Sequence, residues 1–470
     1  MDRNQLDKRL IKVVPTERQI AHQQMEFYSF IHFTVNTYTG KEWGDGTEAE
    51  SIFNPVKFDA MQWVKAIKAA GMKGMILTCK HHDGFCLWPS KYTDHTIAKS
   101  PYRNGKGDLV KEVSQACKAE GIRFGIYLSP WDRNNRNYGY GKAYDDYFVS
   151  QLTELLTEYG DICSVWFDGA CGEGENGKKQ VYDWNRYYEV IRTLQPDACI
   201  HVCGPDVRWC GNEAGDTRPA EWSVVPRRTS ETEKIAAESQ QTDDAQFRKR
   251  PIKASDQDLG SREALENEED LIWYPAEVNT SIRPGWFYHE EEDCKVRTLE
   301  ELIHIYYNSV GGNATFLLNI PPTREGIFHE NDVKRLEEMG DYLKAVFARN
   351  LLEEAGIGVD SWEEGYDIEA VRRDNYEQFF KTEDGIRSAD IKVSFPHPVS
   401  VSHVVLKENI RMSQRIEGFE IKDDKGHVLY QGSTVGYKKI AVFPRTAVKE
   451  LHIHITDARV CPTLAFLGIY

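Results

Sequence analysis

Residues 161–169, DICSVWFDG, decide how the first two-thirds of the chain is interpreted. Residues 163–167 are mostly apolar, and such a run is typical of a strand in a parallel sheet that helices cover on both faces. A carboxylate, Asp168, and Gly169 follow at once. An unpaired carboxylate is unfavourable to bury. Asp168 therefore either turns the chain and caps the next helix, or is held by the strand at the mouth of a barrel.

Similar strand-like stretches recur along the chain. They start near residues 28, 73, 122 and 161, and amphipathic segments with apolar residues at i, i+3 and i+4 separate them. Several of these helical segments end in glycine, namely Gly71, Gly121 and Gly160. Further strand-like segments, ACIHVCG, DLIWYPAEVN and NATFLLNIPP, follow before residue 350. Seven clear strands and one uncertain strand predict a (β/α)8-like, TIM-type barrel over residues 1–350, and no G-x-G-x-x-G opens a helix as in a dinucleotide fold.

The pattern changes after about residue 350. Short segments of alternating polar and apolar residues, separated by Pro, Gly and Asp turns, predict a C-terminal β-sandwich of the jelly-roll kind over residues 351–470. Within the barrel region, residues 204–271 form a long polar stretch where a strand and a helix are expected. Loops of that length in a compact domain usually have a function or lack a fixed structure.

Composition excludes several classes of partner. The chain of 470 residues has 74 acidic and 58 basic residues and no long basic tract, so nucleic acid and anionic membranes are not expected partners. No apolar run approaches the roughly 20 residues that span a bilayer. The N-terminal segment lacks the apolar core of a signal peptide, which leaves a cytoplasmic protein or a trimmed periplasmic or secreted form. The ten cysteines form no C-x-x-C pair, so we expect buried thiols rather than structural zinc.

Residues that carry chemistry gather where the strands are expected to end. In a barrel, the C-terminal ends of the strands and the loops that follow them form the active site. The candidates on this rim are histidines, tryptophans and carboxylates, with one tyrosine. They are His32, Glu42, Trp43, His81, His82, Tyr127, Trp131, Asp168, Glu213, Glu277 and Trp286.

Three kinds of site fit this set. A metal hydrolase would use His32, His81, His82 and Asp168, but barrel metal sites usually take His-x-His from one strand face, and His81 and His82 are adjacent. A non-catalytic sugar-binding barrel would keep the aromatic side chains and histidines without needing two acids. A glycosidase uses one carboxylate to attack the anomeric carbon and another to protonate the leaving oxygen. In that case Asp168 is the ionised nucleophile, and a second carboxyl in a less polar place keeps its proton.

Four motifs make the chain recognisable. HHDGFCLW, GIYLSPW, VWFDG and WCGNEAGD together resemble glycoside hydrolase family 29, the α-L-fucosidases, from about residue 25 to 350. The resemblance implies a (β/α)8-like barrel, a C-terminal sandwich, a retaining mechanism, no metal or other cofactor, and a fucosylated oligosaccharide or glycoconjugate as substrate. By matching motifs, Asp168 resembles the nucleophile, and Glu213 resembles the acid/base of one subfamily. The residues that resemble the fucose-binding set are His32, His81, His82, Tyr127 and Trp286, with Trp43 matching more loosely.

Two segments narrow the resemblance. HFTVNTYT and AEVNTSIRPGWFY depart from the broad-specificity branch of the family. Both resemble the narrower branch, which removes fucose α1,3- or α1,4-linked to a branched N-acetylglucosamine, as in Lewis-type glycans. A broad-specificity fucosidase and a non-catalytic fucose-binding barrel are the alternatives.

The acid/base has two candidates. Glu277 is expected to follow a barrel strand and is near Trp286 in the sequence, whereas Glu213 is flanked by Trp209 and two glycines that let an aromatic ring shield it. A shielded carboxyl keeps its proton, as a general acid must. Spacing alone does not separate the two, and the GNEAG resemblance favours Glu213. Glu277 is then expected to bind a hydroxyl or orient the pocket.

Overall fold

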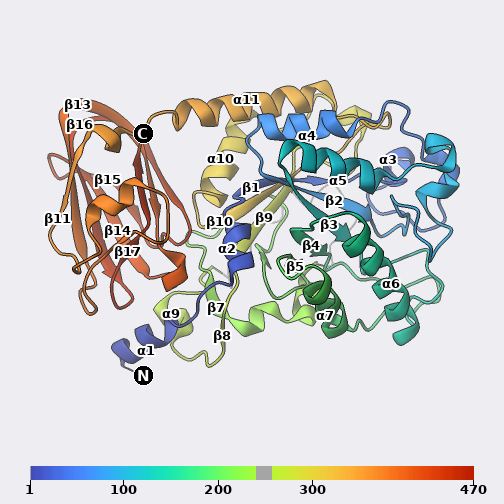
Figure 1. Cartoon of the computed structure of the whole chain (residues 1–470), viewed down its shortest axis with the longest axis horizontal. Coiled ribbons are helices and arrows are strands. Elements are labelled where there is room, and N and C mark those ends of the chain that lie inside the picture. Colours follow the sequence, from blue (N-terminus) through green and yellow to red (C-terminus); the bar gives the residue numbers. More distant parts are fainter. Residues whose placement is uncertain (1, 240–256) are drawn as a thin grey trace.

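The computed structural model describes residues 2–239 and 257–470. Figure 1 shows two regions side by side, a sheet surrounded by helices and an antiparallel sheet formed by the C-terminal part of the chain. The helix α11 (Glu330–Val346) runs along the first region toward the second, and the next strand, β11 (Gly356–Val359), already belongs to the antiparallel sheet.

The first region is the predicted barrel. Among the described residues its sheet has eight strands in the order β5-β4-β3-β2-β1-β10-β9-β6, and every neighbouring pair is parallel. A parallel bridge between His201 and Val207 joins β5 to the segment that enters β6, so the sheet is nearly closed. The strands are β1 (Phe27–Ile31), β2 (Gly74–Lys80), β3 (Arg123–Leu128), β4 (Ser164–Phe167), β5 (Cys199–Val202), β6 (Arg208–Trp209), β9 (Ala276–Ser281) and β10 (Ala314–Asn319).

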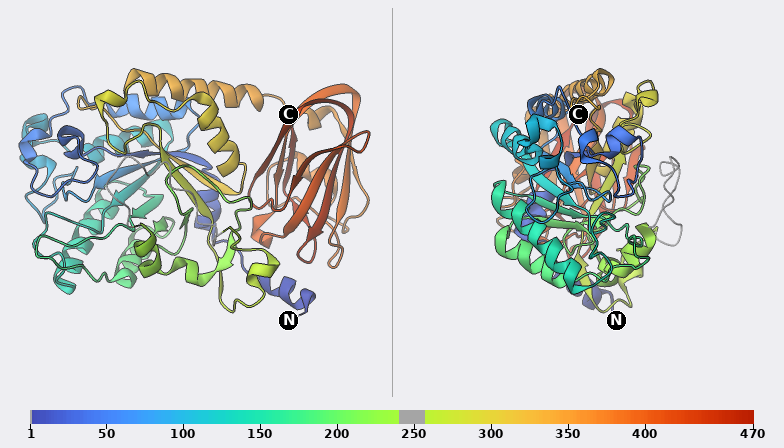
Figure 2. Two further views of the ribbon diagram at one scale, coloured as in Figure 1. Left: turned by 180° about the vertical axis from the view of Figure 1, so that it is seen from behind. Right: turned by 90° about the vertical axis from the view of Figure 1, so that its right-hand side faces the viewer.

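Helices cover the outside of this sheet, as the two views in Figure 2 show. Acidic N-caps fix where several of them begin, because the side chains of Asp59, Asp108 and Asp183 accept hydrogen bonds from backbone N–H groups of the first turn. The predicted glycine stops are confirmed, since Gly71 and Gly121 have φ values of 87° and 70°. The helices are α1 (Arg3–Leu10), α2 (Glu17–Gln23), α3 (Asn36–Thr39), α4 (Ala60–Ala69), α5 (Leu109–Glu120), α6 (Lys142–Glu158), α7 (Trp184–Leu194), α8 (Thr232–Ser239), α9 (Arg262–Leu265), α10 (Leu299–Ser309) and α11.

One predicted strand is divided in the structure. The segment DLIWYPAEVN does not form a single strand, because Pro275 separates β8 (Leu271–Trp273) from β9. β8 pairs antiparallel with β7 (Val224–Pro226) outside the barrel. Proline has no N–H to donate to a sheet, so the ladder breaks there and the barrel strand starts one residue later. Glu277 is therefore the second residue of β9. The prediction that it lies at the C-terminal end of a barrel strand is wrong.

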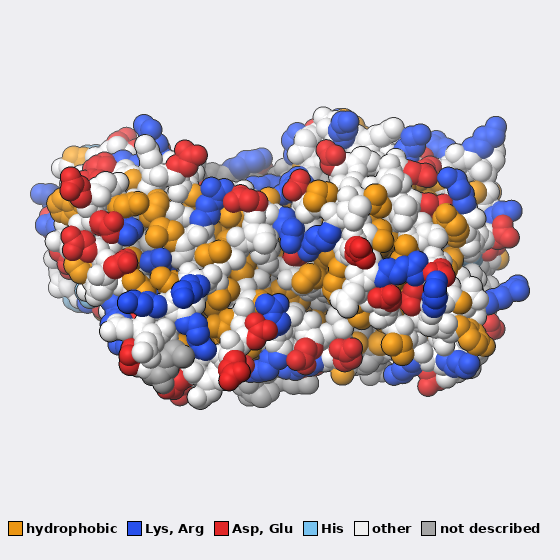
Figure 3. All heavy atoms as spheres, turned by 60° about the horizontal axis from the view of Figure 1, so that its bottom comes forward, with side chains coloured by type: hydrophobic (Ala, Val, Ile, Leu, Met, Phe, Trp, Pro, Cys, Tyr) orange, Lys and Arg blue, Asp and Glu red, His pale blue; other side chains and the backbone are white. Residues whose placement is uncertain are grey.

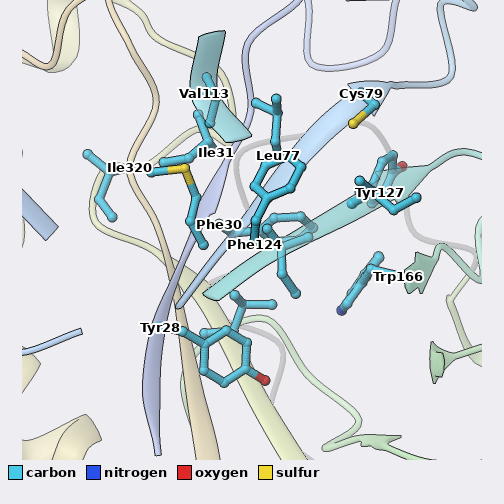
Figure 4. Packing of buried hydrophobic residues seen from close by; sticks show 14 of the residues in the cluster. Tyr28, Phe30, Ile31, Leu77, Cys79, Val113, Phe124, Tyr127, Trp166 and Ile320 are labelled. Atoms are coloured by element: carbon cyan, nitrogen blue, oxygen red, sulfur yellow. The ribbon is translucent and has the colours of Figure 1, made fainter. Parts of the chain in front are cut away.

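The barrel interior is rich in aromatic rings. Figure 4 shows Phe30, Tyr127 and Trp166 close together between the strands. The rings of Tyr127 and Trp166 stack, with centroids 5.4 Å apart, and Phe30 lies 5.0 Å from Trp166. All three side chains are buried. The residues at the C-terminal ends of the strands pack on this aromatic layer.

The C-terminal strands pair antiparallel, and two of them are longer than the segments predicted from the sequence. β13 (Ala389–Lys407) and β16 (Lys439–Ala458) each contain two segments that the sequence separated. Their pairing register shifts between Ser394 and Val399, which flank Pro396 and Pro398. Two residues without N–H groups interrupt the ladder without ending the strand. The other strands are β11, β12 (Phe380–Lys381), β14 (Ile416–Asp423), β15 (Val428–Gly432), β17 (Thr463–Leu464) and β18 (Phe466–Ile469).

Charged groups join the two regions. Glu26, at the start of the barrel, accepts a hydrogen bond from the hydroxyl of Tyr437 at 2.9 Å and lies 3.1 Å from Nζ of Lys438. Burial alone would raise the pKa of Glu26, but the surrounding lysines outweigh it and hold that pKa well below its usual range. Arg262 of α9 similarly contacts Asp7 of α1 at 2.6 Å and Asp457 of β16 at 2.7 Å.

The surface carries charges of both signs. On the face drawn in Figure 3, Lys and Arg side chains are interspersed with Asp and Glu. In the part of the chain that the structure describes, no helix is both long enough and apolar enough to cross a bilayer.

Candidate active site

A pocket opens at the C-terminal ends of the barrel strands. Eight of the predicted site residues line it: His32, Glu42, Trp43, His81, His82, Asp168, Glu213 and Trp286. The sequence analysis did not select eight others as site residues: Phe30, Trp166, Gly169, Ala170, Val202, Trp209, Ser239 and Asn279. Two of these residues could have been found from the two-residue period of a strand, in which alternate side chains share a face. Phe30 precedes His32 by two positions, and Trp166 precedes Asp168 by two positions.

Asp168 is held in a fixed orientation at the base of the pocket. Its Oδ2 accepts a hydrogen bond from the hydroxyl of Tyr127 at 3.0 Å, and its Oδ1 accepts one from the backbone N–H of Ala170 at 2.8 Å. Its side chain is 21 % exposed, and Nε2 of His82 lies 3.8 Å from Oδ2. Burial raises the pKa of Asp168, and the hydrogen bonds from Ala170 and Tyr127 oppose that rise. The carboxylate is thus oriented by protein donors while still reaching the pocket.

The three histidines of the pocket are uncharged at neutral pH. Burial lowers the pKa of His32 and of His82 to about 3, and that of His81 well below its ordinary value. Nδ1 of His32 lies 2.9 Å from Oδ1 of Asn319, whose amide nitrogen donates to the carbonyl of Trp286 at 2.8 Å. Because that second bond fixes the amide, Nδ1 of His32 is the donor and Nε2 is left as an acceptor. Neutral imidazoles of this kind suit hydroxyl groups.

Glu42 connects two loops across the pocket mouth. Its carboxylate accepts a hydrogen bond from the backbone N–H of Trp286 at 2.7 Å and contacts Nε2 of His289 at 2.7 Å. The hydrogen bond to Glu42 raises the pKa of His289. Glu42 therefore fixes the loop that carries Trp286 to the loop after β1.

Aromatic rings complete one wall. The ring of Trp43 meets those of His82 and Trp131 edge-on, with centroids 5.6 and 5.5 Å away. Trp131 does not line the pocket; it supports Trp43 from behind, and its Nε1 donates to the carbonyl of Glu173 at 3.3 Å. Tyr127 likewise lies behind the lining and acts on it through Asp168.

Glu213 and Glu277 occupy different environments. Glu213 lines the pocket from the loop after β6 and is half-buried. The side chain of Asn212 fixes the turn of this loop by accepting backbone hydrogen bonds from Ala214 and Gly215 at 3.0 and 3.2 Å. Glu277 does not line the pocket and is fully buried in the barrel interior, because it lies near the start of β9.

Two groups in the described residues offer several metal-ligand types within 4.8 Å of one another. They are His81, His82 and Asp168 at the pocket, and His22, His201 and Glu277 in the interior. In the first group, Asp168 already accepts a hydrogen bond from Tyr127, and Nδ1 of His82 lies 2.7 Å from the hydroxyl of Ser129. These protein partners account for the orientation of both side chains.

Comparison with known proteins identifies the family to which the chain belongs. Residues 14–346 match the family model described as alpha-L-fucosidase. The chain is 37% identical to alpha-L-fucosidase 1 of Arabidopsis thaliana over 97% of this chain and 87% of that protein.

Solved structures agree with that match. The structure of a putative alpha-L-fucosidase from Bacteroides ovatus superposes with a TM-score of 0.85 at 42% identity, covering 99% of this chain and 76% of that one. A family 29 fucosidase of Ruminococcus gnavus, solved in complex with fucose, gives a TM-score of 0.83 at 29% identity, over 97% of this chain and 95% of that one. The chain belongs to the α-L-fucosidases of glycoside hydrolase family 29 and is a glycoside hydrolase.

Proposed function

We propose that this α-L-fucosidase works with retention of configuration, with Asp168 as the nucleophile and Glu213 as the acid/base. The observation that carries the proposal is the orientation of the Asp168 carboxylate by Tyr127 and Ala170 in a pocket of uncharged histidines. Asp168 bonds to the anomeric carbon while Glu213 gives its proton to the departing oxygen. In the second step Glu213 takes a proton from water, the water oxygen bonds to the anomeric carbon, and the bond to Asp168 breaks.

The other pocket residues support a neutral sugar in the site. Uncharged histidines exchange hydrogen bonds with hydroxyl groups without adding charge, and tryptophan rings such as Trp286 offer apolar surface to the C–H face of a pyranose. A carboxylate at the base of such a pocket faces the ring carbon rather than a charged substituent. This chemistry favours L-fucose, a sugar with three free hydroxyls and a methyl group when glycosidically bound.

We further propose a preference for fucose α1,3- or α1,4-linked within branched, Lewis-type glycans. Residues 204–271 contribute Trp209, Glu213 and Ser239 to the pocket wall, so this long segment provides contacts beyond those given by the strand ends. Nε1 of Trp209 donates to Oδ1 of Asn279 at 2.9 Å, which fixes the indole against β9. We assign this wall to the branch sugar of the substrate.

The first prediction tests the nucleophile. Asp168→Ala should fold and bind fucosylated glycan but lose about three orders of magnitude or more in turnover, because the covalent intermediate cannot form. Free fucose release and product NMR are the measurements. The parent should release α-L-fucose first. With added azide, the Asp168→Ala variant should form β-fucosyl azide. Parental turnover in the variant would refute the assignment, binding without turnover in the parent would favour a binding protein, and an inverted first product would refute retention.

The second prediction concerns pH. The nucleophile must be ionised, so kcat/KM should fall as pH drops through the pKa of Asp168, which burial places above 3.8. Tyr127→Phe removes a hydrogen bond that stabilises the ionised form and lowers this pKa. The acid limb of the pH profile should therefore move to higher pH in the variant. A limb at unchanged or lower pH would contradict the role of Tyr127.

The third prediction separates the two candidate acids. A good leaving group needs no protonation, so Glu213→Ala should lose far more rate on a natural glycan than on an aryl fucoside with an acidic phenol. Added azide should intercept the fucosyl-enzyme of this variant and give α-fucosyl azide. If Glu277→Ala shows this combination and Glu213→Ala does not, the roles must be exchanged.

The fourth prediction concerns linkage. A Lewis trisaccharide and 2′-fucosyllactose are incubated separately with the enzyme, and free fucose is followed over time. Release from the branched substrate should be faster, because only in that substrate does the sugar that carries fucose also carry a galactose branch for the wall around Trp209. Faster release from 2′-fucosyllactose would favour the broad-specificity alternative.

A further inference from the structure

Glu277 is a carboxyl group in a place where a side chain of the barrel is ordinarily apolar. It is 0 % exposed and lies near the start of β9, beneath the pocket. Replacing a buried charged or polar cluster by apolar residues of similar volume is often neutral or stabilising. Stability alone therefore gives little reason for an acid at this position.

Three side chains from other strands hold this carboxyl group. Oε1 accepts a hydrogen bond from Nε1 of Trp166 on β4 at 2.7 Å. Oε2 accepts one from the hydroxyl of Tyr28 on β1 and contacts Nδ1 of His201 on β5 at 2.8 Å. Among the described strands of the sheet, β9 is hydrogen-bonded only to β10 and β6, so all three contacts cross the barrel interior. Glu277 thus connects four strands at one level below the pocket.

Trp166 connects Glu277 to the pocket. Its ring lines the pocket, and its N–H is a donor with no acceptor function, so the carboxyl of Glu277 fixes the ring plane. That ring stacks on Tyr127 with an interplanar angle of 24°. Tyr127 in turn donates to Oδ2 of Asp168. Figure 4 shows Tyr127 and Trp166 side by side next to Phe30.

We infer that Glu277 is a positioning residue that sets the orientation of Trp166 and, through the stacked ring of Tyr127, the orientation of Asp168. It touches neither the pocket nor the reacting atoms. The inference rests on the proposed function of Asp168, and it assigns Glu277 a role other than acid/base or contact with substrate.

The test removes the acceptor, then the donor, then both. Glu277→Leu leaves the N–H of Trp166 without an acceptor. Trp166→Phe replaces the indole by an aromatic ring that has no N–H. Each should lower kcat/KM on a fucosylated substrate by about tenfold or more, since small displacements at a site can cost up to about a hundredfold. The double variant should stay within about twofold of Trp166→Phe alone, because coupled residues are not additive. Glu277→Gln keeps an amide oxygen for Trp166 and should recover most of the activity.

A matched control separates positioning from support of the fold. Glu408 is also fully buried and accepts three hydrogen bonds, from the backbone N–H groups of Arg415, Ile416 and Gly436, but it lies in the C-terminal region. Glu408→Leu should lower Tm and leave kcat/KM unchanged at a temperature where the protein is folded. Glu277→Leu should lower kcat/KM at that same temperature and move the acid limb of the pH profile upward, as Tyr127→Phe does.

The inference is overturned if the losses of Glu277→Leu and Trp166→Phe add, or if the acid limb of Glu277→Leu matches that of the parent. Parental kcat/KM in Trp166→Phe overturns it as well, and this variant decides the question even if Glu277→Leu does not fold. The parent and Asp168→Ala are measured in parallel. If the parent releases no fucose or Asp168→Ala retains turnover, the proposed function fails; if both behave as expected, a negative result concerns Glu277 alone.

Discussion

The interior of a nearly closed parallel barrel is filled by side chains, so a polar group placed inside is unfavourable unless it has a hydrogen-bond partner. This constraint governs the layers of the molecule. Deep in the barrel, Glu277 is surrounded by donors from other strands. One layer higher, Asp168 has two donors and an open side that reaches the pocket. In the proposed mechanism, the buried acid and the reactive acid differ in their depth along the barrel axis.

The loops that follow the strands are also held by hydrogen bonds, but by fewer of them. Glu42 and Asn319 each bond to the backbone of Trp286, from two different sides of the pocket mouth. A tryptophan held at both its N–H and its carbonyl keeps one position when the pocket fills. Around Trp43 the contacts are edge-on ones between aromatic rings, with His82 and Trp131 as the neighbours.

The barrel and half of the pocket lining could be predicted from the sequence because both depend on periodicity. Apolar runs ending at His32, His81 and Asp168 locate strand ends directly. Glu277 escaped this reasoning because Pro275 hides a strand boundary inside an apolar stretch, so a residue near a strand start was placed at a strand end. Trp131 and Tyr127 lie directly behind the residues that line the pocket. No period in the sequence distinguishes a ring that lines a pocket from one that supports the lining. In the C-terminal region, Pro396 and Pro398 suggested a strand break where the structure has only a change of register.

The charged contacts around Glu26 have a consequence for how the molecule unfolds. Glu26 precedes the first barrel strand, and Lys407, Tyr437 and Lys438 of the C-terminal region contact it, as does Lys73 of the barrel. Separating the two regions would take Lys407, Lys438 and the hydroxyl of Tyr437 away from Glu26 and leave it with Lys73. The C-terminal sheet therefore helps to hold the start of the first barrel strand in place, so the two regions are coupled when the chain unfolds.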